Sequence, residues 1–184
     1  MELKRNKIRN TQYAIRDTKY AFTLVEILIV VAILGILAAI TLPTLRGHIA
    51  EAKEAAAKDN LRILRNAIEF YAAQHNGIPP GYIPGWHSGT TYADFFILQL
   101  CKAATNADGQ TASPGTPGFP LGPYVRTMPL NPFNKLDTIK IVADDTEFPP
   151  DATGEFGWIY QAATHTIRID WTSTDREEVR YYDY

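Results

Sequence analysis

The sequence predicts an α+β fold in which one long, bent N-terminal helix packs on a small antiparallel sheet. Three observations predict it: a long apolar run near the N-terminus, a helix-forming amphipathic stretch directly after it, and short β-like runs among Pro- and Gly-rich loops in the remainder. These features divide the chain into four parts, namely residues 1–21, 22–45, 46–76 and 77–184.

Residues 1–21 are polar and basic, and we interpret them as a cytoplasmic leader peptide. They carry six Lys or Arg against two acidic residues, whereas the rest of the chain carries 12 basic and 18 acidic residues. Positive charge before an apolar run keeps the N-terminus in the cytoplasm and places the C-terminal body outside. An acidic body with few clustered basic residues also argues against nucleic-acid binding.

Residues 22–45 read FTLVEILIVVAILGILAAITLPTL and contain one charged residue, Glu26. Thr41 is the only polar residue between positions 27 and 42. Sixteen helical residues span about 24 Å, close to the thickness of the hydrocarbon core of a bilayer. The run therefore predicts a single membrane-spanning helix.

A secretory signal peptide is the alternative interpretation, since small residues such as Ala38 and Ala39 could support cleavage after the run. However, the helical pattern continues beyond it. Pro43, together with Gly35, is expected to bend the helix without ending it, because helical periodicity resumes on both sides. Asn76-Gly77 and the prolines that follow predict the helix end.

Residues 46–75 are rich in strong helix formers and predict the amphipathic half of the helix. We expect its apolar stripe to pack on the sheet, with Leu64 and Ile68 buried. The predicted stripe consists of Leu45, Ile49, Ala52, Ala56, Leu64, Ala67, Ile68 and Tyr71. A continuous helix of about 54 residues would be about 80 Å long, which suits the core of a filament better than a small globular domain.

Residues 77–184 predict a globular head. The expected elements are a helix over Tyr92–Ala104 capped by Thr90 or Thr91, a strand over Thr138–Ala143, a hairpin of Phe156–Ala163 with His165–Trp171, and an edge strand over Val179–Tyr182. Cys101 has no second cysteine to pair with, and its apolar neighbours predict a buried structural thiol.

No enzyme active site is recognisable, so we predict a protein that is not an enzyme. The histidines (His48, His75, His87, His165) show no metal-ligand spacing, and the serines Ser88, Ser113 and Ser173 lie in no nucleophile motif. An acidic patch could hold calcium, but it lacks regular ligand spacing and is better explained as a solvated loop. It comprises Asp144, Asp145, Glu147, Asp151 and Glu155.

Glu26 carries the functional signal. A charge at membrane depth is costly and therefore indicates function and a partner of opposite charge. The natural partner is the amino terminus of a neighbouring subunit, which requires that a new terminus be made by cleavage just before Phe22.

The segment Phe22-Thr23-Leu24-Val25-Glu26, followed by the apolar helix with Gly35 and Pro43, resembles the N-terminal signal of type IV prepilins and type II secretion pseudopilins. The resemblance implies that a prepilin peptidase cuts between Ala21 and Phe22 on the cytoplasmic side and methylates the new amino group of Phe22. It also implies that Glu26 neutralises the N-terminus of an adjacent subunit. The family prefers Gly before the cut, so the methyl group of Ala21 is expected to slow cleavage.

A further resemblance extends over AKEAAAKDNLRILRNAIEFYAAQHNGIPP and GPYVRTMPLNPF, which are similar to major pseudopilins of the G type. It implies a homo-oligomeric filament, minor pseudopilins or pilins, and an assembly platform in the inner membrane, with the head outside the cytoplasm. Those pseudopilins bind calcium in a C-terminal loop that is not recognisable here after Trp171; we therefore expect no cofactor. A surface pilin remains open, as does a membrane-anchored ligand-binding or enzymatic domain.

Overall fold

The computed structural model describes residues 22–86 and 89–184, and the predicted leader lies outside them. The chain divides into two compact units, Met1–Leu45 and Arg46–Tyr184. One helix, α1 (Leu24–Gln74), begins in the first unit and ends in the second, which confirms the predicted long helix. Helical backbone continues through Gly35 and Pro43, so neither residue ends the helix, and the bend itself stays a prediction.

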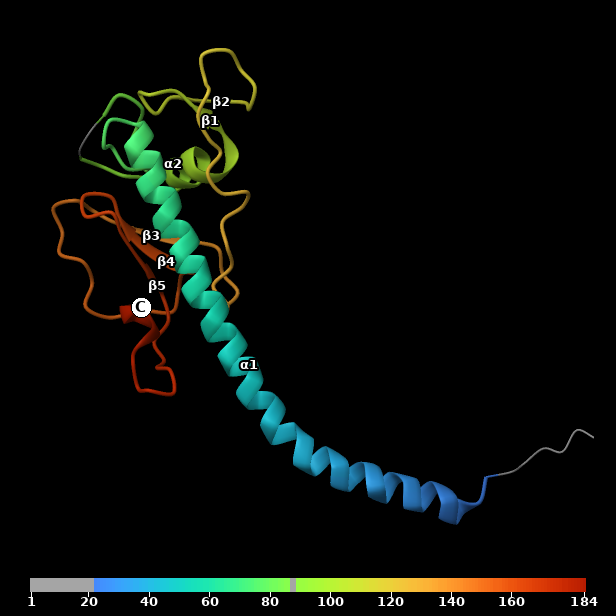
Figure 1. The fold of residues 1–184 in the computed structure, drawn as a ribbon. Helices are drawn as coiled ribbons and strands as arrows, with labels where there is room; N and C mark the ends of the chain where they lie inside the picture. The colour runs from blue at the N-terminus through green and yellow to red at the C-terminus, as the bar shows by residue number, and fades with distance from the viewer. Residues whose placement is uncertain (1–21, 87–88) are drawn as a thin grey trace, which may run out of the picture. The chain divides into compact units, whose positions relative to one another are not determined.

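The second unit contains a three-stranded sheet of β3 (Ile139–Val142), β4 (Trp158–Gln161) and β5 (Thr166–Ile169), drawn in orange and red in Figure 1. The predicted hairpin is confirmed, since β4 and β5 pair antiparallel. The sheet is nevertheless mixed and not purely antiparallel, because β3 pairs parallel with β4. Residues 143–157 form a crossover connection long enough to return the chain in the same direction.

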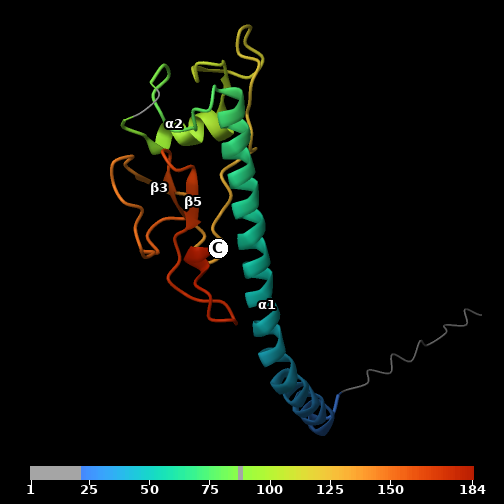
Figure 2. The same cartoon turned by 60° about the vertical axis from the view of Figure 1, so that its left-hand side comes forward.

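The core of this unit lies between the sheet and the second half of α1, which run side by side in Figures 1 and 2. Leu64 and Ile68 are fully buried, as predicted. The cluster also includes Leu61, Tyr71, Trp158, Tyr160, Ile167 and Ile169. Burying an aliphatic side chain of this size stabilises a fold by roughly 1.5–3 kcal/mol.

The start of the predicted apolar stripe is wrong. Ile49, Ala52 and Ala56 are exposed, and the first buried helix residue is Ala57. Periodicity identifies an apolar face but not where its partner begins. Before Ala57 the head contacts α1 through the polar side chain of Arg176, which pairs with Glu51 and donates to the carbonyl of Gly47, and apolar burial begins only at Ala57. The exposed apolar residues before it have no covering element among the described residues of the head.

The elements between helix and sheet differ in detail from the expectation. The predicted helix over Tyr92–Ala104 is α2 (Ala93–Ile97) continued by a π-helical turn, η1 (Leu98–Lys102). Neither Thr90 nor Thr91 caps α2, because Tyr92 occupies the cap position without a side-chain hydrogen bond. Two short strands, β1 (Ala104–Thr105) and β2 (Thr111–Ala112), form a second sheet that sequence reasoning missed.

The predicted edge strand over Val179–Tyr182 is also wrong. Residues Tyr181–Asp183 form a 3₁₀ turn, η2, and only an isolated bridge joins Thr174 to Arg180. Tyr182 is buried against Val142 and Ile159. This tertiary packing of an aromatic ring overrides the strand preference of the local sequence.

Candidate processing and assembly site

The first turn of α1 forms a capping box that involves the predicted functional carboxylate. The backbone N–H of Thr23 donates to Oε2 of Glu26 at 2.8 Å, and the Thr23 hydroxyl donates to the same oxygen at 2.9 Å. In return, the backbone N–H of Glu26 donates to Oγ1 of Thr23 at 3.2 Å. This reciprocal arrangement satisfies helix-terminal N–H groups and fixes the Glu26 side chain.

Only one oxygen of the Glu26 carboxylate is used in this way. Among the described residues, none donates a hydrogen bond to Oε1. Phe22, which precedes the box, is 79% exposed. The helix start therefore presents an oriented carboxylate oxygen beside an exposed aromatic ring.

The rest of this half of α1 has the length and hydropathy of a membrane span. Residues Leu24–Thr41 have a mean hydropathy of 2.8, and none of them is buried within the structure. The hydroxyl of Thr41 donates to the carbonyl of Leu37 at 3.1 Å, so this polar group has a partner within the helix itself. Length and composition allow this helix to cross a membrane.

The structure describes some of the predicted site residues and not others. Phe22 and Glu26 lie within one turn of each other, whereas Ala21 lies outside the described residues. A side chain at Gly35 would meet nothing within 4 Å in the single chain. Thr23 is the functional residue that sequence reasoning missed, although the Thr-x-x-Glu spacing could have identified it.

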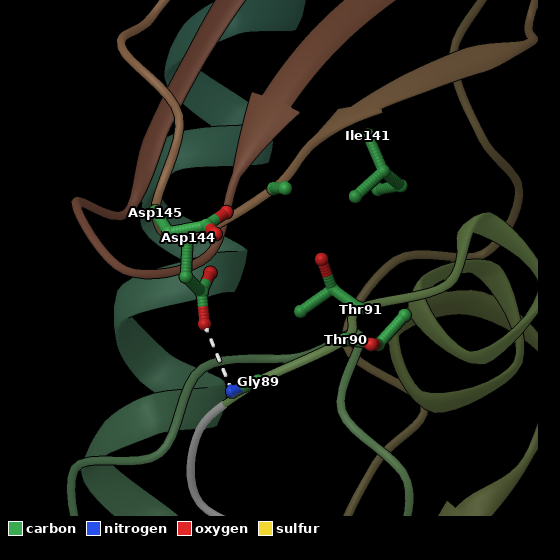
Figure 3. Close-up of a pocket in the computed structure, with 7 residues that line it drawn as sticks. Gly89, Thr90, Thr91, Ile141, Asp144 and Asp145 are labelled. Atoms are coloured by element: carbon green, nitrogen blue, oxygen red, sulfur yellow. Dashed lines mark hydrogen bonds between the residues drawn. The ribbon is translucent and has the colours of Figure 1, made fainter.

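The head shows a hollow of about 560 Å³ between the loop before α2 and the end of β3 (Figure 3). Its lining residues are Gly89, Thr90, Thr91, Ile141, Ala143, Asp144 and Asp145. Asp144 already accepts hydrogen bonds from Tyr82 and Gly89. The polar side chains of the lining are the hydroxyls of Thr90 and Thr91 and the carboxylates of Asp144 and Asp145.

His75 and Cys101 occupy buried positions in the head. His75 is buried, with Nδ1 2.7 Å from the Tyr71 carbonyl and Nε2 3.0 Å from the Thr105 hydroxyl. Burial lowers the pKa of His75, although its hydrogen bond to the Tyr71 carbonyl acts in the opposite direction. Cys101 is buried as predicted, and burial raises the pKa of its thiol to about 11, which makes it a poor nucleophile at neutral pH.

The carboxylates of the acidic patch that could hold calcium do not converge in the structure. Across residues 22–86 and 89–184, no group of three or more His, Cys, Asp or Glu side chains converges as metal ligands would. Asp144 is occupied by hydrogen-bond donors, and Asp151 is paired with Arg180. Calcium takes six to eight oxygen ligands, and two of the five carboxylates of the patch, Asp144 and Asp151, already have partners within the chain.

The family model described as the prokaryotic N-terminal methylation motif matches residues 16–42. The type II secretion system core protein G of Klebsiella pneumoniae is 30% identical over 112 residues, which are 61% of this chain and 67% of that protein. The protein of the same name from Aeromonas hydrophila is 29% identical over 61% of this chain and 66% of its own length.

The prepilin peptidase-dependent protein D of Escherichia coli is 30% identical over 56% of this chain and 75% of its own length. No solved structure matches the chain significantly. The methylation motif covers the capped helix start, and the relatives extend the similarity well beyond it. The chain belongs to the type IV pilin and type II secretion pseudopilin family.

Proposed function

We propose that this protein is a structural subunit of a type II secretion pseudopilus or a related filament. It is made as a membrane-inserted precursor, cleaved between Ala21 and Phe22, methylated on the Phe22 amino group and polymerised. The observation that carries the proposal is the capped start of α1. There Glu26, the only charged residue among 22–45, is held with one oxygen free, within the matched methylation motif.

The capping box is compatible with this processing. Cleavage before Phe22 leaves the Phe22–Thr23 peptide bond intact, so the Thr23 N–H can still donate to Glu26. The free Oε1 can then accept a hydrogen bond from the Phe22 ammonium group of a neighbouring subunit. In a medium of low dielectric constant, this pairing offsets the penalty of holding either charge alone.

The exposed apolar surface of α1 also supports a polymer. Every residue of Leu24–Thr41 is unburied in the single chain. Such a surface requires lipid before assembly and other helices after it. We therefore propose copies of this chain as the main partners, joined by minor pseudopilins or pilins.

The remaining partners and the location follow from this scheme. A prepilin peptidase would process the precursor, and an assembly platform in the inner membrane would extract the mature subunit. The basic leader and the single span Leu24–Thr41 favour a single-pass protein of the inner membrane with its head outside the cytoplasm.

A surface pilin is the second candidate, because fimbrial protein EcpB of Eikenella corrodens is 47% identical over 58 residues. That similarity covers only 32% of this chain, whereas the protein G relatives of Aeromonas hydrophila and Klebsiella pneumoniae extend over 61%. The broader similarity favours the secretion pseudopilin.

The proposal is tested by the N-terminus of the mature protein in cells that express a prepilin peptidase. Mass spectrometry should find methylated Phe22, and only the precursor when the peptidase is absent. Ala21→Gly should be processed at least as fast as the native chain, while Ala21→Leu should accumulate precursor in the membrane. Equal processing of all three chains would contradict the assigned cleavage site.

A further inference from the structure

Two C-terminal segments of the head are joined by the guanidinium of Arg180, and the guanidinium of Arg168 contacts both segments as well. We call residues 148–152 and 180–183 the C-terminal clasp. The guanidinium of Arg180 donates to Asp151 at 2.7 Å and to the carbonyl of Pro150 at 3.3 Å. It also donates to both carboxylate oxygens of Asp183, at 2.7 and 3.1 Å. These hydrogen bonds to Asp183, followed by its charge, raise the pKa of Arg180.

Aromatic contacts close the clasp from its other side. The Tyr182 hydroxyl donates to the carbonyl of Pro149 at 2.6 Å, and the Tyr182 and Phe148 rings lie 6.3 Å apart. The guanidinium of Arg168 lies over both rings, 5.0 Å from the Tyr182 centroid and 5.2 Å from that of Phe148. Since Tyr182 is 1% exposed, the clasp is anchored in the core.

The oxygen atoms around Arg180 form the kind of set that a divalent cation gathers. Two carboxylates and one backbone carbonyl, from segments 30 residues apart in sequence, converge on one positive group. Hard divalent cations such as calcium use these same ligand types to hold loops together. Here the planar guanidinium pairs with Asp183 through two parallel hydrogen bonds and reaches the other segment with a third nitrogen–oxygen contact.

The neighbouring carboxylates of Asp170 and Asp175 accept hydrogen bonds from backbone N–H groups, which disfavours a metal ion at the same position. Asp170 accepts backbone N–H groups of Thr153, Gly154 and Phe156. Asp175 accepts those of Glu177 and Val179. N–H groups that point at a carboxylate carry partial positive charge and repel a cation from the same position.

We infer that the guanidinium of Arg180 takes the place of a divalent cation in this head. The clasp is held by a cation that belongs to the chain, and the head therefore folds without a bound metal ion. This inference concerns the head alone and goes beyond the filament function proposed above.

The test uses the full-length protein in detergent, with thermal unfolding followed by near-ultraviolet circular dichroism. For the native chain, neither EDTA nor calcium chloride should change the midpoint temperature. Arg180→Gln should lower the midpoint by about 2–4 °C, the shift expected for loss of a small charged network in a domain of this size. Calcium should then raise the midpoint of this variant, because Asp151 and the Pro150 carbonyl lose their guanidinium partner, while Asp183 keeps only its contact with Arg168 at 3.4 Å.

Arg126→Gln is the matched control, because Arg126 is exposed and none of the ion pairs among the described residues includes it. It should match the native chain with and without calcium. Asp151→Asn provides a milder variant, which should lower the midpoint less than Arg180→Gln. A native chain that loses stability in EDTA would overturn the inference. So would an Arg180→Gln chain that is as stable as the native one or that does not respond to calcium.

Discussion

The two halves of α1 use similar apolar residues and yet have opposite surroundings. In the first half Ile33 is 53% exposed and Leu34 is 57% exposed, whereas Leu64 and Ile68 in the second half are completely buried. The sheet of the head covers the second half, whereas residues Leu24–Thr41 of the first half are unburied in the single chain. Apolar composition therefore indicates that a partner is needed, but only the structure shows which half has its partner within the same chain.

The charged side chains of the two regions also differ, in whether they have a partner of opposite charge within the described chain. In the head, most of the charged groups near the C-terminus are paired, as Arg180 is with Asp151 and Asp183. At the start of α1, Glu26 is held by Thr23 but has no cation within the described chain. The head therefore pairs these charges within the chain, whereas the proposed partner of Glu26 belongs to a second subunit.

The largest expected effect comes from placing charge in the buried half. Replacing both Leu64 and Ile68 with Asp removes roughly 1.5–3 kcal/mol of apolar burial at each position and buries two carboxylates. Because the net stability of a domain is only about 5–15 kcal/mol, we expect the head to unfold. Loss of the near-ultraviolet signal of the buried Trp158 measures this in the full-length protein.

The matched control places the same charges on the exposed side of the same helix segment. Ile63 is 42% exposed and Asn66 is exposed, so the Ile63→Asp/Asn66→Asp double variant should retain the native signal. If both double variants unfold to the same extent, the buried face of α1 has been assigned wrongly.

A charge in the first half of α1 should affect membrane insertion and leave the stability of the head unchanged. Aspartate near the centre of a membrane helix costs about 2.5–3.5 kcal/mol of insertion free energy. Ile33→Asp should therefore reduce the fraction of protein that resists carbonate extraction from membranes, while the thermal transition of the head stays unchanged. Ile33→Val serves as the control, and an unchanged membrane fraction for the Asp variant would exclude a spanning role for this segment.

A smaller effect is expected at Asp170, which is fully buried and organises residues 153–156. Burial raises the pKa of Asp170, but hydrogen bonds from Gly154, Phe156 and Thr153 together outweigh it and lower the pKa below its ordinary value. A carboxyl with a lowered native pKa stabilises the fold above its unfolded pKa, and that stability is lost as pH falls through the native pKa.

Asp170→Asn should therefore cost about 2 kcal/mol of unfolding free energy at about pH 7 and flatten the loss of stability below about pH 4. Denaturant unfolding at both pH values measures this. Asp145→Asn is the control, because the exposed Asp145 carboxylate contacts only the Thr146 hydroxyl, at 3.5 Å. Equal stability of the two variants at neutral pH would show that Asp170 does not hold the loop.

The spacing of apolar residues along the chain was sufficient to predict the features that are set by local sequence. The extent of α1, the burial of Leu64 and Ile68, the buried Cys101 and the hairpin of β4 and β5 were all predicted and confirmed. At the site, the position of Glu26 was recognisable from its isolation in an apolar run. The capping contacts of Thr23 were not predicted, although the Thr-x-x-Glu spacing of a capping box is present in the sequence.

The predictions that were wrong concern features that depend on contacts between segments far apart in sequence. The parallel pairing of β3 with β4 is set by where residues 143–157 return the chain, and no local pattern records that. The turn at Tyr181–Asp183 replaces a predicted strand because Tyr182 packs against Val142 and Ile159. The side chains that hold the C-terminal clasp likewise come from segments far apart in sequence.

The central claim is that Glu26 is completed by the amino terminus of another subunit. Glu26→Gln keeps the size of the side chain and its ability to accept the Thr23 hydrogen bonds, but it removes the charge. The most direct measurement is the yield of shear-released filament relative to mature subunit in the membrane, with Glu54→Gln as the control on the polar half of α1. We predict that Glu26→Gln is inserted and processed but yields about tenfold less filament or lower, while Glu54→Gln assembles normally. If Glu26→Gln forms as much filament as the native chain, the ion pair between subunits is contradicted.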